Sequence, residues 1–317
     1  MRLENIGFYT LSDERARLAS VYSPLSRCEI VLSGRCNFRC PYCRSIGGED
    51  IPFFQALNIV NMWCDEGLKN IRFSGGEPTL YDGLEELVMV AKRRGVERVA
   101  LSTNGSATRD QYRNLVDLGV DDFSISLDAC CAEDGDMMAG GRKGAFETVV
   151  KNIECLVHYS YTTVGVVLTS TNVKRTEEII DYADSLGVSD IRVIPAAQYG
   201  VKLPVINVKE SLLKKYPILA YRENNLRRGR SVRGNPTKRC GLVLDDMAVM
   251  GDKHYPCIIY MREGGQPIGI ISRNMRNERW EWSKKHDCTK DEICSNNCLD
   301  VCVDYNKKYW KYWKVTP

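Results

Sequence analysis

A strict alternation of short apolar runs with helical periods, between residues 28 and 194, limits the fold more than any other feature of the chain. The apolar runs are rich in Val, Ile and Phe, as expected for strands that are buried on both faces. The predicted strands are residues 28–32, 71–74, 99–102, 123–127, 163–168 and 191–194. The predicted helices between them are residues 52–66, 84–94, 109–118, 145–158 and 176–186. This alternation predicts an α/β fold with a parallel sheet and right-handed crossovers, either an open doubly wound sheet or an incomplete barrel.

The charge balance and the apolar runs exclude some classes of partner. The chain has 317 residues, with 44 Lys and Arg against 41 Asp and Glu, so its formal charge is only +3. This charge predicts no strong field for nucleic acid or for an anionic membrane. The longest apolar runs, such as residues 164–168, are far shorter than the roughly 18 to 20 residues of a bilayer span, and residues 1–5 lack a signal-peptide core. We therefore expect a cytoplasmic protein without membrane or nucleic-acid partners.

Fourteen cysteines are the second constraint. The cytosol keeps thiols reduced, so clustered cysteines there favour metal binding over disulfides. A first group directly follows the first predicted strand and consists of Cys36, Cys40 and Cys43. A second group lies in the last quarter of the chain and consists of Cys240, Cys257, Cys288, Cys294, Cys298 and Cys302. We interpret the other five as small buried hydrophobes in strand or helix patterns: Cys28, Cys64, Cys130, Cys131 and Cys155.

The first cysteine group places three thiols within eight residues. Thiolates at this spacing can converge from one loop on a soft metal centre, and three ligands leave one coordination position open. A structural zinc site would need a fourth Cys or His close by, and no His precedes His158. A zinc loop is therefore the weaker alternative.

Small polar residues follow the predicted strands in succession. The second strand is followed by Ser-Gly-Gly-Glu-Pro-Thr at residues 74–79, in which two glycines let the backbone pass close to a ligand and a carboxylate can accept from an ammonium group. The third strand leads into residues 102–105, Ser-Thr-Asn-Gly, and the fourth into residues 124–128, Ser-Ile-Ser-Leu-Asp. The carboxyl ends of parallel strands are where ligands bind in both open sheets and barrels.

These two motifs resemble the radical S-adenosylmethionine (SAM) superfamily. The resemblance covers residues 26–197 and rests on the three-cysteine spacing, with Tyr42 before the third cysteine, and on the later glycine-glycine-glutamate-proline motif at residues 75–78. It implies a partial (β/α)6 TIM-like barrel. It also implies a [4Fe-4S] cluster held by Cys36, Cys40 and Cys43, whose fourth iron chelates the amino and carboxylate groups of SAM.

The resemblance also implies a set of SAM contacts. Gly75, Gly76 and Glu77 would hold the ammonium group. Contacts to the carboxylate and the ribose would come from Ser102, Thr103, Asn104, Ser126 and Asp128, and Tyr42 and Pro78 belong to the same cofactor-binding set. Arg142 would help with the carboxylate, although many relatives place an arginine two positions earlier, where this chain has Gly140.

The implied reaction is reductive. One electron from the cluster cleaves SAM to methionine and a 5′-deoxyadenosyl radical, which abstracts hydrogen from a substrate carbon. This chemistry needs a low-potential cluster beside a dry pocket, and an electron donor such as flavodoxin or ferredoxin.

The C-terminal cysteines resemble the auxiliary-cluster extension called SPASM, or its shorter twitch form. Cys240 and Cys257 look like its opening hairpin, and the spacing of Cys288, Cys294 and Cys298, followed by Cys302, also matches. A complete pattern has a further cysteine three residues before Cys288, where this chain has Lys285. The resemblance implies one or two auxiliary [4Fe-4S] clusters, but six thiolates cannot give two clusters four cysteine ligands each. A zinc site formed by Cys240, Cys257 and two later cysteines is the alternative.

Two histidines flank the second cysteine group. His254 and His286 are candidate ligands there, and ordinary loop histidines are the favoured interpretation. Helical periodicity after residue 240 is weak, which predicts short strands at residues 255–261 and 268–272. We expect the aromatic and basic tail at residues 305–314 to pack over the barrel opening.

The predicted organisation is an N-terminal segment (1–25), the barrel (26–197), a linker (198–239) and an auxiliary-cluster domain with its tail (240–317). We interpret the basic stretch at residues 222–239 as a solvent-exposed face of this linker. The favoured substrate is a peptide or protein side chain. The first alternative is oxidation or rearrangement of a small molecule, such as a sugar, an alcohol or a cofactor precursor. Modification of tRNA and a non-catalytic zinc protein that binds nucleic acid are the weaker alternatives.

Overall fold

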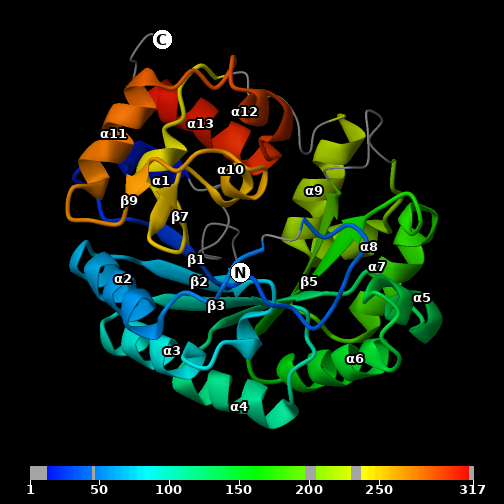
Figure 1. Ribbon diagram of the computed structural model, residues 1–317. Coiled ribbons are helices and arrows are strands. Elements are labelled where there is room, and N and C mark those ends of the chain that lie inside the picture. Colours follow the sequence, from blue (N-terminus) through cyan, green and yellow to red (C-terminus); the bar gives the residue numbers. More distant parts are fainter. Residues whose placement is uncertain (1–12, 45–46, 197–204, 230–236, 314–317) are drawn as a thin grey trace.

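The computed structural model describes residues 13–44, 47–196, 205–229 and 237–313. A curved sheet forms one part of the molecule, with α2, α3, α4 and α6 along its outer face (Figure 1). The elements from β7 to α13 form a second lobe, which also contains the N-terminal helix α1 (Asp13–Leu18). In the part of the chain described here, no helix is long and apolar enough to cross a membrane.

Six neighbouring parallel strands confirm the predicted partial barrel. Their order in the sheet is β6-β5-β4-β3-β2-β1, and every adjacent pair is parallel. Each predicted strand is present with slightly longer or shifted ends: β1 (Arg27–Ser33), β2 (Asn70–Gly75), β3 (Arg98–Thr103), β4 (Asp122–Ser126), β5 (Tyr161–Leu168) and β6 (Asp190–Pro195). Since each strand is followed by a crossover, all six carboxyl ends meet at one edge of the sheet.

The five predicted helices lie between these strands. They are α2 (Phe53–Asp65), α3 (Leu84–Arg93), α4 (Arg109–Leu118), α6 (Ala145–Leu156) and α7 (Thr176–Ser185). A short helix that the sequence analysis did not predict, α5 (Ala132–Met138), precedes α6. The helices bury large side chains against the sheet, such as Trp63 and Tyr112, which pack in one core with Phe73 and Phe123. This burial fixes the strand ends that carry the site.

A seventh parallel strand joins the two lobes. Strand β7 (Asp246–Met250) pairs with β1 from Arg27↔Asp246 to Val31↔Met250, and β8 (Lys253–Tyr255) and β9 (Gly269–Ile270) follow antiparallel. The Arg27 guanidinium also donates to the Asp246 carboxylate, at 3.0 Å from Nε. The cysteine-rich lobe is therefore bonded directly to β1, the outermost of the six barrel strands on that side, a connection that the sequence analysis did not predict.

The second lobe is mainly helical, in contrast to the prediction. The predicted strand at residues 255–261 ends at Tyr255, because Pro256 has no N–H to continue a ladder, and Cys257 then begins α10 (Ile258–Arg262). The strand predicted at residues 268–272 shortens to β9. Three further helices follow: α11 (Met275–Lys285), α12 (Glu292–Asn297) and α13 (Asp300–Trp313). We predicted that the tail packs over the barrel opening. Helix α13, which contains the described part of the tail, packs instead against α1 and the 3-10 turn η5 (Leu242–Leu244).

A buried arginine holds the second lobe to β7. Arg279 of α11 is 1% exposed and donates to the carbonyl oxygens of Val243 at 2.8 Å and Tyr255 at 3.0 Å, and also to that of Asp246. One side chain thus binds the turn η5, the start of β7 and the end of β8. These carbonyls have a charged donor in place of water.

The segment predicted as a linker is in part packed structure. It contains α8 (Glu210–Lys215) and α9 (Pro217–Arg227), and α9 lies against β6 with Ile218 and Leu219 fully buried. The first arginine of the basic stretch, Arg222, is also buried and pairs with Asp300 of α13. For this arginine the prediction of a solvated face is wrong. Residues 197–204 and 230–236 lie outside the described part.

Asp190, the first residue of β6, makes stability depend on pH. It is fully buried and accepts from the backbone N–H groups of Ile191 at 2.8 Å and Ile218 at 3.1 Å, which anchors α9. Burial raises the pKa of Asp190 to about 6, whereas an unfolded aspartate has a pKa of about 3.9. Between these values the folded state holds a proton that the unfolded state has lost, so stability falls as pH rises.

We expect this carboxyl group to reduce the free energy of unfolding by about 1.4 kcal/mol between pH 5 and pH 7.5. Asp190→Asn cannot titrate and is expected to lack this contribution. Urea unfolding of both proteins at the two pH values measures it as the change in their stability difference. An unchanged stability difference would contradict the assignment.

Candidate functional site

The first cysteine group lies on the loop that follows β1. Cys36 and Cys43 are exposed, Cys40 is partly buried, and all fourteen cysteines of the chain have free thiols. Burial, the Asp128 carboxylate and the neighbouring Cys43 and Cys36 raise the pKa of Cys40 to about 12. Three soft donors carried by one loop suit an iron-sulfur centre. The residues therefore fit the predicted cluster.

The glycine motif lies directly against the backbone that leads into this loop. Gly76 N donates to Ser33 O at 2.7 Å, and Glu77 N donates to Arg35 O at 2.8 Å. A Cβ atom at Gly76 would come within 3.0 Å of the Arg35 carbonyl group, so the close approach requires glycine there. The loop after β2 is thereby fixed beside the loop that carries Cys36.

Glu77 connects the loops that follow β2 and β3. Its side chain is fully buried, and its carboxylate accepts from Thr79 N at 3.1 Å, Thr79 Oγ1 at 2.7 Å, Thr103 Oγ1 at 2.7 Å and Asn104 N at 2.6 Å. Burial raises the pKa of this carboxyl group. Through these hydrogen bonds Glu77 joins the two loops, and its contact with the SAM ammonium group stays a prediction. The adjoining Pro78 begins the turn η2 (Pro78–Leu80).

Asn104 extends this connection to the cysteine loop. Its Nδ2 donates to Asn37 Oδ1 at 2.8 Å and lies 3.7 Å from Cys36 Sγ. Ser102 is half-buried at the end of β3. The structure therefore brings the polar ends of β2 and β3 together with Cys36, as the sequence analysis expected.

Tyr42 connects the cysteine loop to the end of β4. Its hydroxyl donates to the carboxylate of Asp128, which also accepts from Val167 N at 2.6 Å. Burial raises the pKa of Asp128 to about 6. Ser126 is exposed at the end of the same strand. Asp128 thus supports the loop through Tyr42.

Arg142 approaches the cysteine loop from the other side. Its Nη1 donates to Asn37 O at 3.1 Å, and its guanidinium lies 6.0 Å from the centroid of the Phe38 ring. Many relatives place an arginine at the position of Gly140. In this chain Gly140 has φ +84°, and a Cβ atom there would come within 3.0 Å of Arg39. A side chain does not fit at that position, whereas Arg142 is an exposed cation beside this loop.

The second cysteine group also comes together in space. The Sγ atoms of Cys288 and Cys294 lie within 4.8 Å of each other. Cys240 and Cys294 raise the pKa of Cys288, and Cys302 raises that of Cys298, so these thiols are neighbours. The hydrogen bond from Cys288 is the main reason why the pKa of Cys240 is lowered to about 7. Burial, followed by the charges of Cys302, Cys240 and Cys294, raises the pKa of Cys257. This gathering of thiols fits a thiophilic metal centre.

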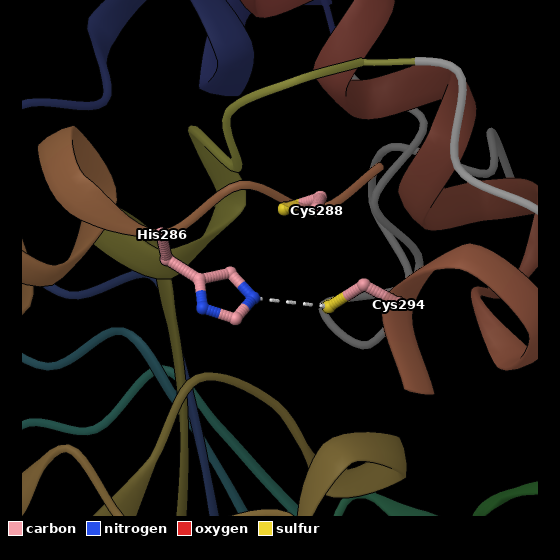
Figure 2. Close-up of side chains that lie close together, drawn as sticks. All are labelled: His286, Cys288 and Cys294. Atoms are coloured by element: carbon pink, nitrogen blue, oxygen red, sulfur yellow. Dashed lines mark hydrogen bonds between the residues drawn. The ribbon is translucent and has the colours of Figure 1, made fainter. Parts of the chain in front are cut away.

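The two histidines near this group differ. His254 is fully buried, and its Nε2 lies 2.9 Å from Glu278 Oε2, so it is engaged away from the thiols. His286 instead faces them: its Nε2 lies 3.7 Å from Cys294 Sγ (Figure 2). The donor atoms of His286, Cys288 and Cys294 all lie within 4.8 Å of one another.

Residues 30–183 match the family model of the radical SAM superfamily. The matched residues include both the cysteine motif and the glycine motif, so the match agrees with the class of enzymes expected from them. Radical SAM enzymes use a [4Fe-4S] cluster and SAM, which are the cofactors predicted for the first cysteine group.

Particular relatives follow from sequence comparison. The chain is 26% identical over 186 residues to a probable GTP 3′,8-cyclase of Metallosphaera sedula, covering 56% of this chain and 58% of the relative. It is 27% identical over 205 residues to the mitochondrial GTP 3′,8-cyclase of Arabidopsis thaliana, covering 59% and 52%. The matched part spans a little over half the length of these curated relatives.

Solved structures extend the likeness in fold beyond the barrel. A structure described as native anSMEcpe with bound AdoMet and Cp18Cys peptide has a TM-score of 0.60 at 17% identity, covering 90% of this chain and 96% of that one. Streptococcus suis SuiB bound to its precursor peptide SuiA has a TM-score of 0.57 at 16% identity, covering 78% and 62%. A match over 90% of the chain must include much of the cysteine-rich lobe.

Proposed function

We propose that this protein reductively cleaves SAM and uses the resulting 5′-deoxyadenosyl radical to abstract hydrogen from a substrate. The observation that carries the proposal is that the loop with Cys36, Cys40 and Cys43 lies beside the glycine motif, at the edge of the sheet where the parallel strands end. A cluster bound by these three thiolates would supply the electron that breaks the sulfur–carbon bond of SAM.

The surrounding residues would orient the loop and SAM. Glu77, Asn104 and the Tyr42–Asp128 pair fix the loop from three neighbouring strand ends. The backbone at Gly75 and Gly76 lies beside the loop and is proposed to receive the ammonium group, and Arg142 the carboxylate. Ser102, Thr103 and Ser126 remain proposed contacts for the rest of SAM.

We further propose that the second cysteine group holds at least one auxiliary [4Fe-4S] cluster. The support is the proximity of these thiols, with Cys288 and Cys294 Sγ within 4.8 Å of each other, and their burial, with Cys288 0% and Cys302 7% exposed. Two clusters would each need an open or non-cysteine ligand position, since only six thiolates are present.

A peptide or protein side chain is the proposed substrate. Support comes from the likeness in fold to a peptide-bound structure over 90% of this chain, whereas the cyclase matches cover 56 to 59% of it. The cyclases favour a second candidate, a purine nucleotide as a cofactor precursor, because they match this chain in sequence. The electron donor would be a flavodoxin or ferredoxin.

The test is anaerobic reconstitution followed by assay with SAM and a reductant. We expect about eight irons per chain with matching sulfide, four for the SAM-binding cluster and four for one auxiliary cluster. We also expect 5′-deoxyadenosine to form only when both SAM and reductant are present. Deuterium transfer from labelled peptides or from labelled GTP into 5′-deoxyadenosine would separate the two substrate classes. Zinc in place of iron, or no reductant-dependent product, would overturn the proposal.

A further inference from the structure

The second cysteine group has a nitrogen donor beside it. His286 follows α11, and its Nε2 points at Cys294 Sγ, with Cys288 Sγ on the adjoining segment (Figure 2). The two cysteines are fixed by the backbone: Cys288 N donates to Lys238 O at 2.9 Å, and Cys294 N donates to Asp291 Oδ1 at 2.8 Å. Three soft or borderline donors therefore face one another from rigid positions.

Aromatic packing holds the imidazole in this orientation. Its ring stacks on Trp282 with centroids 4.0 Å apart and an interplanar angle of 15°, and it meets Tyr260 edge-on at 5.8 Å. The side chain of His286 is only 16% exposed. A ring confined on two sides loses little further freedom when it binds a metal.

One carboxylate competes for the same nitrogen. Asp291 Oδ2 lies 3.6 Å from His286 Nε2, slightly closer than Cys294 Sγ at 3.7 Å. Asp291 is already engaged, because Oδ2 accepts from the Tyr260 hydroxyl at 2.9 Å and Oδ1 from Cys294 N. The imidazole nitrogen is thus left to the thiol side of the group.

We propose that Nε2 of His286 is a ligand of an auxiliary iron-sulfur cluster, together with the thiolates of Cys288 and Cys294. The proposal rests on the proposed function in one respect, the presence of such a cluster in the second cysteine group. Six thiols and one imidazole exceed the four donors of a single zinc ion, which favours a cluster as the occupant.

The chain contains only three histidines, so nitrogen ligation can be assigned spectroscopically. The sample is the full chain with Cys36, Cys40 and Cys43 replaced by alanine, which leaves only the auxiliary centre. Its histidines are labelled with 15N, the cluster is reduced, and pulsed electron paramagnetic resonance measures hyperfine coupling. We expect a 15N coupling that is lost in His286→Phe, which keeps a ring against Trp282, and retained in His158→Ala, an exposed control.

A second readout uses the reduction potential. His286→Cys is expected to lower the midpoint potential of the auxiliary cluster with iron content unchanged, since imidazole ligands raise cluster potentials relative to thiolates. A coupling that persists in His286→Phe, no 15N coupling in the parent, or zinc at the site would overturn the proposal. Formation of 5′-deoxyadenosine by the wild-type chain tests the proposed function separately, because the labelled sample lacks the first cysteine group, so failure here is distinguishable from failure of the proposed function.

Discussion

Alanine at Cys36 is expected to abolish formation of 5′-deoxyadenosine from SAM, a loss of at least about a thousandfold. The cluster proposed for the first cysteine group has three protein ligands on one loop, so the loss of one thiolate removes a third of them. The measurement is product formed per chain under reducing, anaerobic conditions. Iron content should fall by about four atoms per chain, while iron held by the second cysteine group remains.

The matched control is Cys155→Ala. Cys155 is a partly buried thiol on α6, outside both cysteine groups. We expect this variant to retain the iron and the activity of the wild type. If Cys36→Ala and Cys155→Ala cleave SAM equally well, the first cysteine group is not the site of SAM cleavage.

Replacing Arg279 by methionine is expected to destabilise the cysteine-rich lobe by about 3 to 5 kcal/mol. The side chain is buried, and its removal leaves the carbonyl groups of Val243, Tyr255 and Asp246 without their charged donor. Methionine keeps the unbranched apolar stem, so the loss reports mainly on the guanidinium and its hydrogen bonds. Anaerobic urea unfolding, followed by cluster absorbance and tryptophan fluorescence, measures it.

Arg273→Met is the control for that measurement. Arg273 is an exposed arginine shortly before α11, and its replacement should change stability by no more than about 0.5 kcal/mol. Equal effects of the two substitutions would show that the buried guanidinium contributes no more than a surface charge does.

The barrel could be predicted from the sequence because each of its strands is marked locally. Strands such as β3 and β5 are short apolar runs between helices, and their burial on both faces suppresses any polar alternation. Helix α4 has the predicted limits because Thr108 caps its start and Gly119, with φ 108°, ends it. Local signals of this kind do not depend on distant partners.

The second lobe lacks such signals. Strand β7 exists because Asp246 pairs with Arg27, 219 residues away, and no local pattern encodes that register. The helices of the lobe bury Arg279, Cys302 and Asn306 where other helices bury leucine, so their periodicity was obscured. Helix α9 was not predicted for a similar reason: its Arg222 is buried in an ion pair with Asp300, so the helix shows no clear apolar face in the sequence.

The candidate site was also predictable only where its residues are close together in the sequence. The cysteine and glycine motifs were visible because each lies within a few consecutive residues. The hydrogen-bond partners of Glu77 were not, because its four donors come from two loops that only the folded sheet brings together. The position of His286 likewise depends on stacking against Trp282, which its sequence neighbours do not reveal.

The pairing of β7 with β1 has a consequence for how the chain can be divided. A fragment that stopped before the second lobe would leave β1 with a bare row of amide and carbonyl groups between Arg27 and Val31, flanked by apolar side chains. Exposed edges of this kind recruit strands from other molecules, and the fragment would be prone to aggregate. We therefore expect the barrel and the cysteine-rich lobe to fold as one unit rather than as separable modules.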